Sequence, residues 1–115
     1  MKYLSTRNDS LSQSFNDVLY QGLSRDGGLY LPKDWPTVNL DKLLNLSYQE
    51  VAIEIIYPFT KENINKEELS QIISQTYINF KNDKIAPLHK LDKNKFLLEL
   101  FYGPTYAFKD YALQF

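Results

Sequence analysis

The sequence contains no cysteine and a single histidine, His89. Without cysteine the chain has no disulfide framework and no thiolate metal site. A zinc site would have to rely on carboxylates around one imidazole, whereas zinc sites are built mainly from nitrogen and sulfur ligands. We therefore expect no bound metal ion, and we expect His89, which follows Pro87 closely, to be a surface residue.

The sequence also lacks a block of basic residues and a long apolar run. Its 13 Lys and Arg residues are scattered among 14 Asp and Glu residues, for a formal net charge of -1. A nucleic-acid-binding protein would normally show a basic stripe. No apolar run approaches the roughly 20 residues that span a bilayer, and the amino terminus has no apolar segment typical of a secretion signal. These absences predict a cytoplasmic protein that binds neither nucleic acid nor a membrane.

What the sequence does have is an average globular composition with many aromatic residues. Of its 115 residues, 43% are hydrophobic and 23% are charged, as in typical soluble domains. The length fits one domain, or one small domain and the start of another. Nine tyrosines and seven phenylalanines indicate aromatic core packing more than a ligand site.

The first third of the chain predicts short strands around one helix. Residues 2–7 could form an edge strand. Ser14 can cap a helix that ends at Gly22, a residue type suited to helix ends. The sequence Asp-Gly-Gly at residues 26–28 is a strong turn signal, and residues 29–31 after it resemble a strand.

Two further helices are predicted in the middle of the chain. Ser47 and Glu50 have the spacing of a capping box, and Asn65 can cap the next helix. Its apolar residues recur at helical spacing on one face: Leu69, Ile72, Ile73, Thr76, Tyr77 and Phe80. We expect this stripe to face the core.

The pattern changes near Pro87 from helical periodicity to short apolar runs. Residues 92–95 predict a hairpin turn between strands at 88–91 and 96–102. The second run is apolar except for Glu99, which suggests a strand buried on both faces. We therefore expect a helix-rich domain with a minor strand element at residues 1–80 and the start of a second domain at 81–115.

The last residues predict a helix over 107–115, with Thr105 as its N-cap. Its side chains are almost all apolar or aromatic, and a helix that is apolar all round belongs inside a protein. Little chain follows to cover it. We therefore expect this sequence to be the amino-terminal piece of a longer protein.

Lys109 is the candidate reactive residue, because it lies about one turn into that helix, which follows an apolar strand and a Gly-Pro turn. Open α/β sheets bind ligands at the carboxyl ends of their strands. Aromatic neighbours and a helix N-terminus both favour the neutral amine over the ammonium form, and a neutral lysine amine can form a Schiff base with an aldehyde. Without this context, a lysine in an apolar stretch more often has a buried stem and a solvated ammonium group.

The segment around Lys109 resembles the cofactor-lysine segment of the threonine synthase family. The matching run is Leu100-Phe101-Tyr102-Gly103-Pro104-Thr105-Tyr106-Ala107-Phe108-Lys109-Asp110. Two runs near the amino terminus also resemble the family, and they are Tyr3-Leu4-Ser5-Thr6-Arg7 and Gly22-Leu23-Ser24-Arg25-Asp26-Gly27-Gly28-Leu29-Tyr30-Leu31-Pro32. Motifs at both ends of the chain, in the family's order, argue against a chance similarity.

The resemblance implies a pyridoxal-phosphate enzyme of fold type II, with an α/β fold that is α+β within this chain. Such an enzyme is a lyase that converts O-phospho-L-homoserine and water to L-threonine and phosphate by β,γ-elimination and replacement. Lys109 would be the catalytic and the cofactor-binding residue, holding pyridoxal phosphate as a Schiff base. Residues 1–115 alone are expected to be inactive and to bind the cofactor poorly, because their four glycines form no phosphate-binding run.

Three residues depart from the family's pattern. Asn8 stands where a glycine often follows Ser-Thr-Arg, Tyr102 stands where histidine is common before Gly-Pro-Thr, and Tyr106 replaces a frequent leucine. The change at Tyr102 removes a possible acid–base group near the site. We expect Asp110 to have a local structural role.

Two other functions stay open on the sequence alone. A threonine-synthase-like phospho-lyase would share Lys109 but release a different product. A non-catalytic α/β interaction module would dock through the apolar carboxy-terminal helix and would not depend on Lys109. The sequence predicts no particular oligomeric state.

Overall fold

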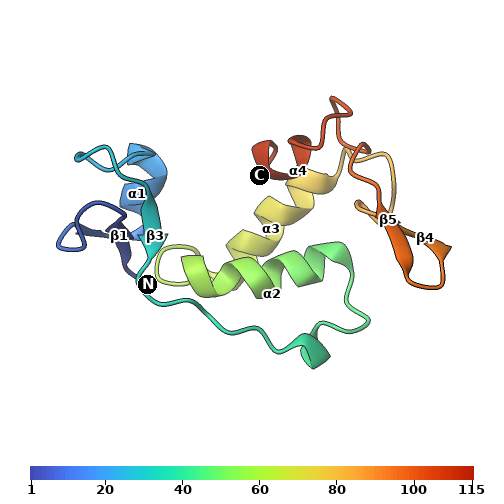
Figure 1. Ribbon diagram of the computed structural model, residues 1–115, viewed down its shortest axis with the longest axis horizontal. Helices are drawn as coiled ribbons and strands as arrows, with labels where there is room; N and C mark the ends of the chain where they lie inside the picture. Colours follow the sequence, from blue (N-terminus) through green and yellow to red (C-terminus); the bar gives the residue numbers. More distant parts are fainter.

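The structure is a computed structural model that describes residues 1–115. It combines helices with two small antiparallel sheets, so the expected α+β arrangement is confirmed (Figure 1). In chain order, the elements are β1 (Tyr3–Ser5), β2 (Ser12–Gln13), α1 (Phe15–Gln21), β3 (Tyr30–Pro32), a 3-10 helix (Leu40–Lys42), α2 (Tyr48–Thr60), α3 (Lys66–Tyr77), β4 (Leu88–Asp92), β5 (Lys95–Leu98) and α4 (Asp110–Leu113).

The first sheet has the strand order β2-β1-β3. The expectation of an edge strand at residues 2–7 is therefore wrong, because β1 is the central strand and both β2 and β3 pair with it. The predicted turn precedes β3, and its Asp26 carboxylate accepts hydrogen bonds from the Ser5 hydroxyl at 2.8 Å and from the Gly28 amide at 2.9 Å. A Cβ at Gly28 would lie 2.3 Å from the Ser5 hydroxyl oxygen, so the close approach requires glycine.

Capping boxes begin the three longer helices. In each box the cap side chain accepts from the backbone amide three residues on, and the carboxylate at that residue accepts from the cap amide. The pairs are Ser14 with Asp17, Ser47 with Glu50, and Asn65 with Glu68. These contacts satisfy amides that have no partner inside the helix, and they confirm the helix starts expected from the sequence.

The core lies between α2 and α3. Leu69 and Ile73 of α3 are fully buried, and Tyr77 and Ile85 complete the buried cluster. Partly buried apolar residues of α2 surround it, together with Phe80 and Tyr111. The apolar stripe was expected to continue along a helix to Phe80, but α3 ends at Tyr77 and Phe80 reaches the same cluster from the turn that follows.

The predicted hairpin is present, with β4 and β5 paired antiparallel and an irregular register between Lys90 and Asp92. The expectation of a strand over 96–102 that is buried on both faces is wrong. The strand ends at Leu98, and every residue of β4 and β5 is exposed. The reason is tertiary, because no helix or second sheet of this chain covers either face of the hairpin.

The first sheet, the helix pair and the hairpin lie next to one another along the longest axis of the molecule (Figure 1). The radius of gyration is 16.5 Å, compared with about 13 Å for a compact domain of similar length. Such an open arrangement explains why 12 of 115 residues are buried. None of the helices is long and apolar enough to cross a bilayer.

Candidate functional site

The lysine turn, which we define as residues 103–110, leads from the hairpin region into α4. The expected helix over 107–115 with Thr105 as N-cap is wrong, since α4 spans Asp110–Leu113 and Lys109 is its N-cap. Turns occupy most of the segment before it, with the Tyr106 amide donating to the Gly103 carbonyl at 3.1 Å. Lys109 therefore lies at the start of a short helix rather than one turn inside a long one.

Asp110 holds the lysine turn together from inside. Its carboxylate accepts hydrogen bonds from the Thr105 amide and from the Thr105 hydroxyl, each at 2.7 Å, and its side chain is buried. Gly103 packs directly on it, because a Cβ at Gly103 would lie 2.4 Å from the Asp110 Cβ. Asp110 therefore has the local structural role expected from the sequence, and it is adjacent to Lys109 in the chain.

The electrostatics of Asp110 match this role. Burial works against ionisation of the carboxyl group, but hydrogen bonds from the Thr105 side chain and amide and from Gln114 outweigh it, so the pKa of Asp110 is lowered. A hydrogen-bonded carboxylate is favoured over its protonated form. The ionised group therefore stabilises the turn at neutral pH.

The lowered pKa of Asp110 predicts how the lysine turn responds to acid. The stabilisation is fully present above the ordinary carboxyl pKa of about 3.9, and it is lost as the pH falls through the lowered value. The Thr105 amide resonance, followed by NMR, should therefore stay constant from neutral pH down to about 4 and shift only below. Asp110→Asn should give the shifted resonance at neutral pH. A wild-type shift well above pH 4 would contradict this expectation.

Tyr106 occupies a left-handed backbone conformation, with φ +62°. Such a conformation is uncommon for residues other than glycine and has to be held by surrounding contacts. The Lys81 amine contacts the Tyr106 hydroxyl and lies 3.6 Å from the centre of the Tyr106 ring, which gives a cation–π contact. The replacement of the family's frequent leucine by tyrosine thus adds a contact between the lysine turn and the segment after α3.

Lys109 itself is exposed and makes no hydrogen bond or ion pair with another side chain of residues 1–115. Its neighbour Phe108 is also exposed, as is Tyr106. The aromatic surroundings expected to desolvate the amine are therefore present in sequence but open to solvent in this chain. The structure provides a free amine on a turn whose backbone is fixed by Asp110.

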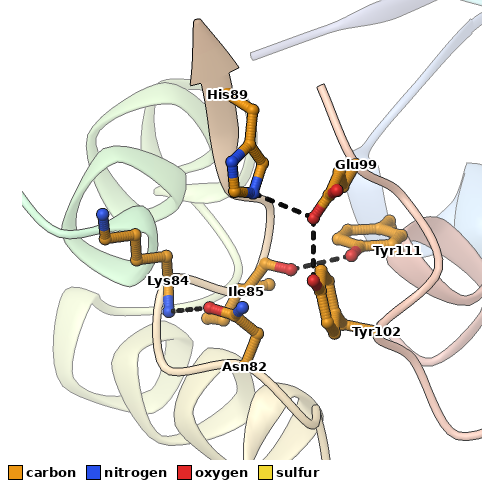
Figure 2. A network of polar contacts seen from close by, with 7 residues as sticks. All are labelled: Asn82, Lys84, Ile85, His89, Glu99, Tyr102 and Tyr111. Carbon is orange, nitrogen blue, oxygen red and sulfur yellow. Dashed lines mark hydrogen bonds and ion pairs between the residues drawn. The ribbon is translucent and has the colours of Figure 1, made fainter. Parts of the chain in front are cut away.

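A cluster that we call the carboxylate bridge lies where the hairpin region meets the lysine turn, and consists of His89, Glu99 and Tyr102 (Figure 2). The Tyr102 hydroxyl donates to Glu99 Oε2 at 2.7 Å, and His89 Nε2 lies 3.1 Å from the same oxygen. The Glu99 side chain is 16% exposed and that of His89 is 57% exposed. His89 is thus at the surface, as expected, but it has a specific partner.

The hydrogen bond to Glu99 raises the pKa of Tyr102, and desolvation and the negative charge of Glu99 act in the same direction. Tyr102 therefore stays protonated and acts as a donor. Glu99 was not expected to be a site residue, although the sequence carries one signal: Glu99 is the single charged residue in the apolar run at 96–102.

Tyrosines attach α4 to α3. The Tyr77 hydroxyl donates to the Tyr111 carbonyl at 2.9 Å, and the Tyr111 hydroxyl donates to the Ile85 carbonyl at 2.7 Å. Burial is the largest cause of the raised pKa of both tyrosines. Phe80 packs edge-to-face on both rings. These contacts determine where the carboxyl end of the lysine turn lies relative to the helix pair.

An apolar groove of about 400 Å³ lies beside Tyr77 and Tyr111. Side chains of α2, α3 and α4 line it, among them Ile55, Tyr77 and Ala112, and Phe115 also lines it. No group of three or more His, Asp or Glu side chains is arranged to hold a metal ion. The polar chemistry of this region is therefore concentrated in the lysine turn and the carboxylate bridge.

Comparison with known proteins identifies relatives of this chain. A family model described as "Threonine synthase N terminus" matches residues 2–77. Threonine synthase of Pseudomonas aeruginosa is 43% identical over 99% of this chain and 25% of its own length. Threonine synthase-like 2 of Xenopus laevis is 35% identical over 98% of this chain and 25% of its own length.

The fold has a matching solved structure. The crystal structure of threonine synthase from Brucella melitensis with bound PLP aligns with a TM-score of 0.90 and 43% identity, over 96% of this chain and 24% of that protein. The chain thus spans about a quarter of the length of the relatives it matches. The family model ends before the lysine turn, whereas the alignment with the Pseudomonas protein extends over nearly the whole chain.

Proposed function

Because this chain belongs to the threonine synthase family, we propose that the protein that carries it converts O-phospho-L-homoserine and water to L-threonine and phosphate, with pyridoxal phosphate as cofactor. The observation that supports this most strongly is 43% identity to threonine synthase of P. aeruginosa over 99% of the chain. The chain spans a quarter of that relative's length, so the proposed activity is that of the whole protein.

Lys109 is the residue of this chain that fits covalent attachment of pyridoxal phosphate. Its amine is exposed and has no ion pair that would have to break, and a lysine amine is the group that binds the cofactor's aldehyde. The glycines of the chain, at positions 22, 27, 28 and 103, form no run that could cradle a phosphate. We therefore assign the phosphate-binding groups to residues outside 1–115.

When bound, pyridoxal phosphate supplies an electron sink for negative charge that develops on substrate carbons. Lys109 Nζ would hold the cofactor, and its amine, when free, would accept and return protons at the substrate carbons. Asp110 and Thr105 fix the backbone on either side of Phe108 and Lys109. A lysine with these two roles would benefit from a fixed backbone, because misplacement of a reacting group slows catalysis steeply.

We place a domain boundary near residue 80, between a helix-rich amino-terminal domain at residues 1–80 and the start of a fold-type-II catalytic domain at 81–115. Two observations support this boundary. The family model ends at residue 77, and the helix pair gives way to a hairpin after Tyr77. A cytoplasmic location belongs to the same proposal and rests on the sequence alone.

The proposed reaction is tested by supplying the purified whole protein with pyridoxal phosphate and O-phospho-L-homoserine and measuring both products. L-Threonine and phosphate should form in equal amounts. Phosphate release with a different organic product would instead support a threonine-synthase-like phospho-lyase. Absence of any phosphate release would leave the non-catalytic interaction module. Residues 1–115 alone should release no phosphate above the level of a Lys109→Ala control.

A further inference from the structure

Glu99, the carboxylate of the carboxylate bridge, is a charged residue inside an otherwise apolar run. A stabilising surface ion pair does not explain its presence there. Surface ion pairs contribute little to stability, and the Asp92–Lys95 pair at the tip of the same hairpin, with a distance of 3.9 Å, is of that kind. Glu99 differs because its side chain is mostly buried, and one of its oxygens accepts from the Tyr102 hydroxyl and lies 3.1 Å from His89 Nε2. Removing the carboxylate would leave a partly buried tyrosine hydroxyl without its partner.

Backbone hydrogen bonds also hold Glu99 and Tyr102, the two residues joined in the carboxylate bridge. The Glu99 amide donates to the Pro87 carbonyl at 3.0 Å, and the Lys81 amide donates to the Tyr102 carbonyl at 2.9 Å. In Figure 2, His89, from β4, lies on one side of the Glu99 carboxylate and Tyr102 on another, with Tyr111 beside Tyr102. Tyr102 is thus fixed through its side chain by Glu99 and through its carbonyl by the segment after α3.

Close contacts link the position of Tyr102 to the backbone position of Lys109. Gly103 follows Tyr102 and packs on Asp110 so closely that a Cβ at Gly103 would lie 2.4 Å from Asp110 Oδ2. Asp110 in turn holds Thr105 by two hydrogen bonds. No linker separates Asp110 from Lys109, because the two residues are adjacent in the chain. A shift of Tyr102 and Gly103 therefore displaces Asp110 and the backbone of Lys109 with it.

We propose that Glu99 is a positioning residue for Lys109, acting through Tyr102 and Gly103 on the lysine turn, an inference that rests on the proposed function for the role of Lys109. Glu99 does not touch Lys109, so its effect is on the geometry of the amine rather than on the chemistry directly. The bridge also gives Tyr102 a use, since its hydroxyl is the donor through which the carboxylate holds the start of the turn.

The test compares Glu99→Gln and Tyr102→Phe with Asp92→Asn in the whole protein. Asp92→Asn is the matched control, because it removes a carboxylate from the same hairpin that pairs only at the exposed tip. Each protein is mixed with pyridoxal phosphate and reduced with borohydride at timed intervals, and labelling of Lys109 and Lys95 is followed by peptide mass mapping. Hydrogen exchange of the Thr105 and Asp110 amides is measured in the wild-type protein and in each of these variants.

Glu99→Gln should slow labelling of Lys109 by about 10-fold to 100-fold, the scale expected when a reacting group is misplaced by an ångström or less. Labelling of Lys95, which is exposed at the hairpin tip, should not change and serves as the internal reference. Tyr102→Phe, which removes one hydroxyl and is the gentler change, should slow labelling in the same direction. The double variant should be no slower than the slower of the two single variants, because Glu99→Gln weakens and Tyr102→Phe removes the same hydrogen bond. The Thr105 and Asp110 amides should exchange faster in both variants and not in Asp92→Asn.

Two other outcomes separate failure of this inference from failure of the proposed function. If wild-type Lys109 is labelled and Glu99→Gln behaves like Asp92→Asn, the positioning role is overturned and the proposed function stands. If wild-type Lys109 is not labelled at all, the proposed role of Lys109 fails and the positioning inference falls with it. In that case faster exchange at Thr105 and Asp110 would show that Glu99 supports the turn for structural reasons only.

Discussion

Lys109→Ala should abolish turnover by the whole protein while leaving the lysine turn folded. Proton transfer by a positioned side chain alone contributes about 10²-fold to 10⁴-fold to rate, and the substitution also removes the covalent attachment of the cofactor. The loss should therefore be at least of that size. The measurement is threonine formation from O-phospho-L-homoserine, together with mass mapping of the wild-type protein after borohydride reduction, which should place the cofactor on Lys109.

The structure explains why this substitution should spare the fold. The Lys109 side chain is exposed, and the contacts that hold the turn come from Asp110 and Thr105. Lys95→Ala, on the hairpin tip, is the matched control and should leave turnover unchanged. A reduced adduct on Lys90 or Lys95, or normal turnover by Lys109→Ala, would refute the assignment of the catalytic lysine.

Leu69→Ala should destabilise the chain by about 2–5 kcal/mol, the range for removing a large aliphatic side chain from a packed core. Leu69 is fully buried in the cluster between α2 and α3, and neighbouring helices can collapse only partly into the space it leaves. Urea unfolding monitored by fluorescence of Trp35 is the measurement. Trp35 is the single tryptophan of the chain, and it lies edge-on against Phe59 of α2.

Ile78→Ala provides the control for this prediction. Ile78 follows α3 directly and is 73% exposed, so its truncation should change the unfolding free energy by no more than about 0.5 kcal/mol. Equal effects at Leu69 and Ile78 would mean that the α2–α3 cluster is not the core. Because Tyr77 and Tyr111 join that cluster to α4, Leu69→Ala should also speed hydrogen exchange of the Asp110 amide.

The helix starts were predictable because a capping box is a local structure. Ser47 and Glu50, for example, are three residues apart, so their contact depends on the geometry of one helical turn. The hairpin was predictable for a similar reason, since its turn joins neighbouring runs. The resemblance to threonine synthases was carried by motifs of adjacent residues, and the family assignment from residues 2–77 agrees with it.

Contacts between distant segments were not predictable in this way. An apolar run such as 96–102 predicts burial, but whether a strand is covered depends on what packs over it, and β5 is exposed on this chain. The helix expected over 107–115 is limited to Asp110–Leu113, and its predicted start is replaced by the turn in which Thr105 bonds to the Asp110 carboxylate.

By itself the sequence determined the local caps, the turn at Asp26-Gly27-Gly28, the hairpin and the identity of the candidate lysine, because each depends on residues that are neighbours along the chain. Only the tertiary structure decided that β1 is a central strand, that Asp110 clamps the lysine turn, and that Glu99 joins His89 to Tyr102 (Figure 2). His89 lies on β4 and Glu99 directly follows β5, so their approach depends on the register of the two strands. Asp110 meets Gly103 and Thr105 only because the chain turns back on itself, and that path is set by packing rather than by local preference.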